Sequence, residues 1–144
     1  MRSNFVFRKA VIDDARKIRQ MVRDEWLNPF GLNWQNFWVI EKEHTAIACG
    51  QLRPRGDIKE LSSLAVLSEY RKQGIGTYLV RHIIRQTDAK VYLSCGSSLK
   101  SFYSQLGFKQ VSWSKLPSQL KYEFGLSRTI ATIRRKQLIF MKHQ

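Results

Sequence analysis

The sequence predicts a single α/β domain in which a mixed, mainly antiparallel sheet of six or seven strands has helices on both faces. Two features of the chain lead to this fold class. Short runs of β-branched, aliphatic and aromatic residues alternate with stretches whose apolar residues recur every three or four positions, which are the patterns of strands and helices. The length of 144 residues suits one domain of ordinary size, and a second domain is not expected.

A strand at 5–7 and a helix over about 15–26 are expected to begin the fold. The helix is predicted from apolar residues spaced three or four apart, namely Ala15, Ile18, Val22 and Trp26. Asp13 is the expected N-cap, because its carboxylate can accept hydrogen bonds from the free N–H groups of the first turn. Four aromatic residues at and beyond the helix end are expected to pack in the core rather than to line a substrate entrance: Trp26, Phe30, Trp34 and Phe37.

The middle of the chain predicts a β-hairpin and a further strand. Segments 37–41 and 45–52 read as two strands joined by a turn at 43–44. A second turn is expected at 53–57, where proline and glycine occur, and the next strand is expected over 58–67.

The rest of the chain predicts two longer helices, one short helix and three strands. A helix ending near Asp88 is predicted from a stripe of apolar residues at Ile75, Leu79 and Ile83. Strands are expected at 91–95, 108–113 and 137–141, with a short helix between the first two. Between the last two, a helix interrupted near Gly125 is expected.

The net formal charge of +14 is concentrated in the second half of the chain. Residues 73–144 hold 12 basic side chains but only Asp88 and Glu123 as acids. Such an asymmetry predicts an anionic partner, such as a nucleic acid, the ribosome or an acidic substrate. A solvated basic surface is an equal alternative. The charge therefore predicts at most a weak contact with nucleic acid that is independent of base sequence.

Several classes of protein do not match the sequence. The apolar runs are short and broken by charges, and residues 1–4 do not begin a signal peptide, so a cytoplasmic protein without a membrane contact is expected. Cys49 and Cys95 lie in strand-like segments and are expected to be buried free thiols rather than a disulfide. The histidines and cysteines lack the spacing of a zinc site, so no metal is expected.

The segment 61–79 carries the strongest functional pattern, in which a strand passes through a polar turn and two glycines into a helix. Gly74 and Gly76 lack a Cβ, so a ligand can approach the backbone at the start of the helix. The free N–H groups and the helix dipole favour an anion there, and Arg71 and Lys72 add full positive charges. A phosphate site is therefore expected. Neither the dinucleotide pattern G-x-G-x-x-G nor the P-loop pattern fits these residues.

These residues resemble the signature of the GNAT superfamily of acyl-CoA-dependent N-acyltransferases. Its pattern Q/R-x-x-G-x-G/A, which follows a hydrophobic strand, is matched by R-K-Q-G-I-G at 71–76 behind L-A-V at 64–66. A second motif of the family, F-Y-x-x-x-G-F, is matched at 102–108, one strand and one helix further on. The resemblance extends over roughly residues 58–112.

The resemblance implies that acetyl-CoA is the co-substrate and that an amine attacks its thioester directly, without a covalent intermediate. It implies that the edge of one strand pairs with the pantetheine amides and that the following loop holds the pyrophosphate. The residues expected in these roles are Leu64, Ala65 and Val66 for the pantetheine, and Arg71, Lys72, Gln73, Gly74, Ile75, Gly76 and Thr77 for the pyrophosphate.

Two catalytic residues are expected from the resemblance. Glu60 is the candidate general base, because it lies on the strand of the L-A-V segment and some family members carry a glutamate there; a solvated charge at the strand end is the equal alternative. Tyr103 is the candidate general acid for the leaving thiolate, with packing against Phe102 and Phe108 as its alternative. Gly96 stands where the family often has an asparagine, so that side chain's hydrogen bond to the cofactor is missing.

The expected function is therefore acetyl-CoA-dependent N-acetylation of an amine on a small molecule, a peptide or a protein. No motif identifies the acceptor amine or the oligomeric state. The alternative is a GNAT-like module without catalytic activity that binds CoA or associates with nucleic acid or the ribosome.

Overall fold

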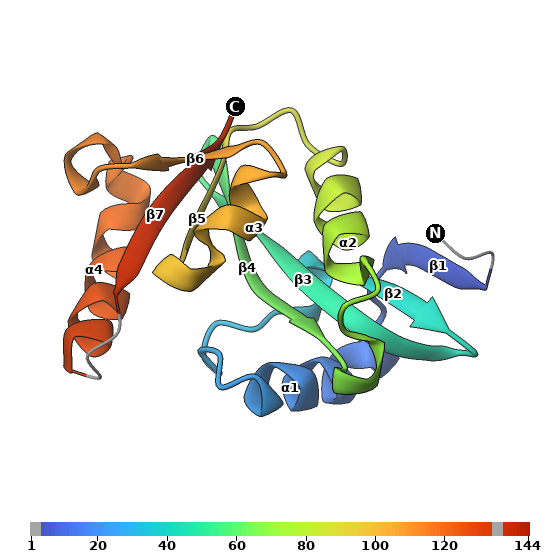
Figure 1. Cartoon of the computed structure of the whole chain (residues 1–144). Coiled ribbons are helices and arrows are strands. Elements are labelled where there is room, and N and C mark those ends of the chain that lie inside the picture. The colour runs from blue at the N-terminus through green and yellow to red at the C-terminus, as the bar shows by residue number, and fades with distance from the viewer. Residues whose placement is uncertain (1–3, 134–136) are drawn as a thin grey trace. The chain divides into compact units, whose positions relative to one another are not determined.

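The computed structural model describes residues 4–133 and 137–144, with the backbone alone over 126–133. Over these residues the fold is a seven-stranded, mostly antiparallel sheet with four α-helices, as predicted (Figure 1). The strands are β1 (Phe5–Lys9), β2 (Phe37–Lys42), β3 (Thr45–Arg55), β4 (Ile58–Val66), β5 (Val91–Gly96), β6 (Phe108–Val111) and β7 (Leu138–His143). The helices are α1 (Ala15–Asp24), α2 (Ile75–Ile84), α3 (Lys100–Ser104) and α4 (Ser118–Ile133).

Hydrogen bonding orders the strands β1-β2-β3-β4-β5-β7-β6. The pairs β1–β2, β2–β3, β5–β7 and β6–β7 are antiparallel. The pair β4–β5 is parallel, with Lys59 opposite Val91 and Glu60 opposite Tyr92. The sheet is therefore mixed, and this parallel pair connects two strands that α2 separates in the sequence.

The chain forms two compact units. The first comprises residues 1–53 and 61–88, and the second comprises residues 54–60 and 89–144. Strand β4 belongs to both units, because its first residues, 58–60, lie in the second and the remainder lies in the first.

In the first unit, α1 and α2 cover opposite faces of the sheet (Figure 1). Ile18 of α1 belongs to the same buried cluster as Cys49 of β3. The next residue, Gly50, faces α2, because a Cβ placed on it would lie 2.8 Å from Ile83 Cδ1. Adjacent side chains of a strand point to opposite faces, so the two helices lie on different sides of β3.

The predicted hairpin is confirmed, and its tip has the geometry that favours it. Glu43 and His44 have φ values of 53° and 67°, both in the left-handed region, as in the two-residue turns that match the twist of paired strands. Strand β3 continues through Arg55, so the turn predicted at 53–57 is confined to Gly56 and its neighbour. Gly56 has φ 65°, a conformation that glycine adopts without strain.

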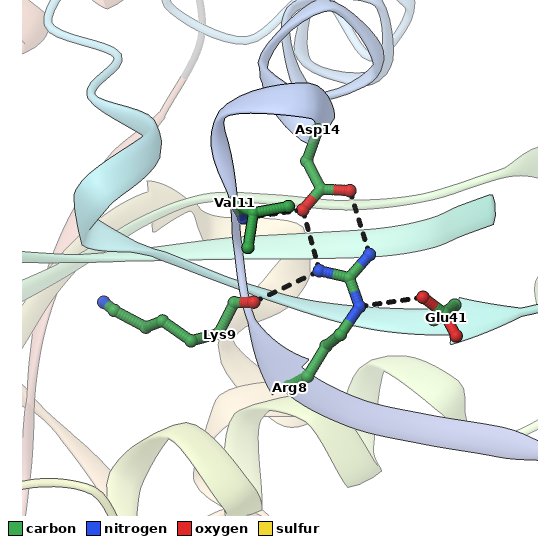
Figure 2. Close-up of polar contacts among 5 residues, drawn as sticks. All are labelled: Arg8, Lys9, Val11, Asp14 and Glu41. Atoms are coloured by element: carbon green, nitrogen blue, oxygen red, sulfur yellow. Dashed lines mark hydrogen bonds and ion pairs between the residues drawn. The ribbon is translucent and has the colours of Figure 1, made fainter. Parts of the chain in front are cut away.

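A cluster of charged residues joins the start of α1 to β1 and β2 (Figure 2). Arg8 donates from its two Nη atoms to both carboxylate oxygens of Asp14, at 2.8 and 2.9 Å, and from Nε to Glu41 at 2.9 Å. The backbone N–H of Val11 donates to Asp14 Oδ2 at 2.8 Å. The expectation that Asp13 is the N-cap is wrong, because Asp13 is exposed. The carboxylate of Asp14 is buried instead, and it accepts hydrogen bonds from Arg8 and from the Val11 N–H.

The expectation of core packing is wrong for two of the four aromatic residues. Phe37 is fully buried, and Trp34 packs in part against the core. Trp26 and Phe30 are 85% and 79% exposed. Helix α1 ends at Asp24, earlier than predicted, and Trp26 has a left-handed φ of 56°. Trp26 and Phe30 therefore lie beyond the helix and do not continue its buried face.

In the second unit, α4 packs on one face of β5 and β7. Leu120 and Phe124 of α4 form a buried cluster with Tyr92 and Phe140 of these strands. The helix continues through Gly125, so the predicted interruption is wrong. A glycine in a helix interior costs only about 1 kcal/mol relative to alanine, which packing can offset.

The ends of α2 and β6 also differ from the predicted ones. Helix α2 ends at Ile84 rather than near Asp88. Strand β6 ends at Val111, and the following residues 113–115 form a 3₁₀ turn. Periodicity predicts that an element exists more sharply than it predicts where the element ends.

Candidate functional site

The loop between β4 and α2 has the backbone geometry of an anion site. Gly74 is the N-cap of α2 with φ 80°, and no side chain caps the helix. Lys72, two residues earlier, is also left-handed, with φ 61°. A Cβ added to Gly74 would meet no protein atom within 4 Å, so the space beside the helix start is open. The first-turn N–H groups of α2 can therefore meet an anion directly.

Arg71 is held by the protein itself. Its Nε donates to the carbonyl oxygen of Val66 at 3.2 Å, and its Nη2 pairs with Glu25. The side chain thus ties the end of β4 and the end of α1 to the loop. A contribution of Arg71 to phosphate binding requires that its guanidinium be shared with Glu25 or released from it.

The other predicted cofactor residues differ in what they can offer. Lys72 and Gln73 are exposed, and Gln73 Nε2 donates to the carbonyl of Glu69 at 3.3 Å. Ile75 is 1% exposed and packs in the core, so it can contribute only its backbone N–H. Gly76 and Thr77 are half-buried in the first turn of α2.

Strand β4 contains a backbone feature that has no signal in the sequence. Ser63 has φ 56°, a left-handed conformation that non-glycine residues seldom adopt within a strand and that is typical of a β-bulge. The Sγ atom of Cys49 donates to its carbonyl at 3.7 Å. The next three residues are the predicted pantetheine segment, of which Ala65 is buried while Leu64 and Val66 are half-buried. The left-handed residue therefore changes the direction of the backbone immediately before that segment.

Glu60 is not a solvated strand-end charge, because it is only 5% exposed. Arg55 Nε lies 3.3 Å from its Oε1, and Arg55 Nη2 also pairs with Glu123 of α4. A buried carboxylate needs such a partner. A role as general base requires the ionised form of Glu60, which a neighbouring guanidinium favours and burial opposes.

Tyr103 of α3 is buried between two aromatic rings. The ring centroids of Phe102 and Phe108 lie 4.9 and 5.6 Å from its own, both edge-on. Burial, and then the neighbouring Cys95, raise the pKa of Tyr103 above its usual range. The phenol therefore keeps its proton at neutral pH, as both a packing residue and a general acid would.

The two cysteines are buried free thiols. Burial raises the pKa of Cys49 to about 12 and that of Cys95 to about 11, so neither is a thiolate at neutral pH. Gly96, which follows Cys95, has room for a side chain: a Cβ there would meet nothing closer than Ser98 Oγ at 3.9 Å. The absence of the asparagine is therefore not forced by packing.

The predicted site residues are divided between the two units. Segments 64–66 and 71–77 lie in the first unit, whereas Glu60 and Tyr103 lie in the second. Across residues 4–133 and 137–144, no three histidine, cysteine or acidic side chains are grouped as metal ligands would be. In the same part of the chain, no helix is both long and apolar enough to cross a membrane.

Comparison with known proteins identifies the family whose pattern the chain matches. A family model described as "Acetyltransferase (GNAT) domain" matches residues 33–110, which include the strand and loop described above. No curated protein matches the chain.

Solved structures share the fold at low sequence identity. N-acetylglutamate synthase from Neisseria gonorrhoeae, complexed with coenzyme A and N-acetyl-glutamate, has a TM-score of 0.78 and 16% identity over 100% of this chain. The match covers 36% of the synthase, so the chain spans about a third of that protein. Rv2747 from Mycobacterium tuberculosis, in complex with CoA and NLQ, has a TM-score of 0.77 and 21% identity, covering 96% of this chain and 98% of that one. A GNAT-family acetyltransferase from Staphylococcus aureus has a TM-score of 0.72 and 17% identity over 96% and 98% of the two chains.

Proposed function

Because the chain belongs to the GNAT acetyltransferase family, we propose that it is an N-acetyltransferase that moves the acetyl group of acetyl-CoA to an amine of a small molecule, a peptide or a protein. The observation that carries the proposal is the uncapped start of α2 at Gly74, which leaves backbone N–H groups facing open space. A pyrophosphate fits such a helix start better than a neutral ligand does. The coenzyme A bound to similar structures supports the same ligand.

The proposed reaction is a direct displacement at the thioester carbonyl. The amine nitrogen forms a bond to the acetyl carbon, the bond from that carbon to sulfur breaks, and the sulfur leaves with the electron pair. One proton must leave the nitrogen and one must reach the sulfur. We assign the first transfer to Glu60, directly or through water, and the second to the phenol of Tyr103. Holding two reactants in line supplies most of the acceleration in such a reaction.

The loop is tested by two substitutions of the same size at one residue. Gly74→Asp places a negative charge where the pyrophosphate is expected, whereas Gly74→Asn adds a similar neutral side chain. Both residues tolerate a left-handed φ, and neither would meet protein atoms there. We expect Gly74→Asp to abolish acetyl-CoA binding in calorimetric titration and Gly74→Asn to weaken it less. Wild-type affinity in a folded Gly74→Asp variant would rule out this loop as the phosphate site.

The activity is tested with a panel of amine acceptors, read as free thiol released from acetyl-CoA. The panel should contain polyamines, aminoglycosides, peptides with free N-termini or lysines, and glutamate, because a similar structure is N-acetylglutamate synthase. Release that depends on one acceptor class supports the enzyme. Acetyl-CoA binding without release from any acceptor would instead support a non-catalytic CoA-binding module, for which the missing asparagine at Gly96 is the motivating observation.

A further inference from the structure

Four aromatic rings of the first unit form a continuous row at the surface. Tyr78 and His82 of α2 stack with centroids 3.9 Å apart, and His82 lies 5.1 Å from Phe7 of β1. Phe7 in turn stacks on Trp38 of β2 at 5.0 Å, with the two ring planes only 4° apart. All four side chains are half-buried rather than buried. These four residues are therefore not part of the fully buried core, and each keeps some surface exposed to solvent.

Lysines are held over rings on the same face of the sheet. Lys9 Nζ lies 4.9 Å from the centroid of Trp38. Lys42 Nζ lies 5.4 Å from the centroid of Phe5 and 5.1 Å from that of Tyr70. The register places Lys9 opposite Trp38 and Phe5 opposite Lys42, so these residues share one face. Cation–π contact fixes each ammonium group beside an aromatic ring.

Helix α2 adds two arginines to this row. Arg81 and Arg85 are exposed, and they follow Tyr78 by three and seven positions, which places them on the same side of the helix. Residues 70–87 contain no acidic side chain, so no carboxylate of this segment neutralises them. We call the four rings with Lys9, Arg81 and Arg85 the aromatic–basic strip.

We propose that the aromatic–basic strip binds single-stranded nucleic acid without sequence preference. Cations at the surface neutralise backbone phosphates and release counterions, and aromatic rings stack with unpaired bases of any kind. The net charge of +14 attracts a polyanion such as nucleic acid. The aromatic–basic strip offers cations for its phosphates and rings for its bases on one surface. A purely acidic peptide would use the cations but not the rings. The proposal is independent of acetyl transfer.

The test is fluorescence anisotropy with a labelled single-stranded RNA of mixed sequence across a salt series. We expect binding whose log affinity falls linearly with log salt concentration. Lys9→Gln should lower the slope by about 0.7, the value for one contact to a single strand. Lys109→Gln is the matched control, because it removes the same charge from an exposed residue of β6 in the other unit and should leave the slope unchanged.

The contribution of the rings is tested with Tyr78→Leu, because Tyr78 ends the row, with His82 stacked on one of its faces. Loss of one stacking ring should weaken RNA binding roughly tenfold without a change in the salt slope. Circular dichroism checks that this variant folds, and the Lys9→Gln result decides the matter if it does not. The proposal is overturned if RNA does not bind at low salt, if Lys9→Gln and Lys109→Gln have equal effects, or if duplex DNA or polyglutamate binds as tightly as the single strand. Displacement of the RNA by saturating CoA would also overturn it, because the ligand would then occupy the cofactor loop.

Discussion

Tyr103 combines a buried ring with a phenol that holds its proton, and both follow from the same surroundings. Removal of the phenolic oxygen separates packing from chemistry, because the ring stays between Phe102 and Phe108. We expect Tyr103→Phe to lower kcat by about 10²-fold while acetyl-CoA affinity stays unchanged. Tyr122→Phe is the matched control, since Tyr122 is 82% exposed on α4.

The pH dependence of kcat gives an independent check on Tyr103. The raised pKa keeps the phenol protonated as the pH rises past 10, where an exposed tyrosine would ionise. Loss of this acid should therefore not appear as a fall in kcat below about pH 10. A wild-type kcat in Tyr103→Phe would leave the residue with a packing role alone.

Glu60 and Glu123 pair with the same guanidinium, so they allow a controlled test of the proposed base. If Glu60 accepts the proton of the amine, Glu60→Gln should lower kcat by about 10²-fold at neutral pH with little change in acetyl-CoA affinity. Glu123→Gln breaks the other ion pair of Arg55 and leaves the carboxylate of Glu60 in place. Equal losses of activity in the two variants, in step with their melting temperatures, would mean that Glu60 serves only to anchor Arg55.

At the scale of elements, the Arg8–Asp14 contact joins α1 to the edge of the sheet. Asp14→Asn leaves Arg8 without its main partner, and we expect a loss of about 2 kcal/mol in the free energy of unfolding at neutral pH. Asp13→Asn, one residue earlier and exposed, should change it by less than about 0.5 kcal/mol. Urea denaturation of both variants measures the difference.

The same contact predicts how that difference depends on pH. Hydrogen bonds from Arg8, opposed by burial and aided by the Val11 N–H, lower the pKa of Asp14. A carboxylate with a lowered pKa stabilises the fold above its unfolded value of about 3.9, and this stabilisation is lost as the pH falls through the folded pKa. The stability gap between wild type and Asp14→Asn should therefore be full at neutral pH and shrink below about pH 4. A gap that is constant down to pH 2 would contradict the assignment.

The elements that the sequence predicted best are those with a strong local period. The hairpin of β2 and β3 follows from two mainly apolar runs on either side of a two-residue turn, and α2 follows from its apolar stripe. The family motifs located the loop at Gly74, because a glycine is needed where φ is 80°. These features depend on residues that are near one another in the chain.

What could not be predicted depends on partners far apart in the chain. Trp26 is exposed although tryptophan is usually buried. Asp14 is buried although aspartate is usually exposed, because Arg8 pairs with it. Glu60 is buried only because Arg55 and the packing around it allow this. Serine has no preference for a left-handed φ, so the conformation of Ser63 within β4 has no local signal in the sequence.

At the scale of the whole molecule, one strand is shared by two compact units. The single domain predicted from the sequence stays a prediction. The shared strand gives a reason to expect it, because β4 cannot unfold in one unit without freeing its backbone groups in the other. We expect one cooperative transition in urea. The check is the fluorescence of Trp113, the only tryptophan of the second unit, isolated as the difference between wild type and Trp113→Phe.

That signal should change at the same urea concentration as the fluorescence that remains in Trp113→Phe, which comes from Trp26, Trp34 and Trp38 of the first unit. Two separate midpoints would show that the units unfold independently, and the chain would then consist of two domains.

Each unit contains one buried thiol, whose reaction with a reagent can measure the local opening of that unit. Cys49 lies in β3 of the first unit and Cys95 in β5 of the second, and both are protonated and shielded in the closed fold. A thiol reagent can modify either one only when its strand transiently opens, so each labelling rate measures the free energy of a local opening. In the proposed thiol-release assay, coenzyme A would therefore carry the accessible thiol, and the two cysteines of the protein would react with the reagent only through such openings.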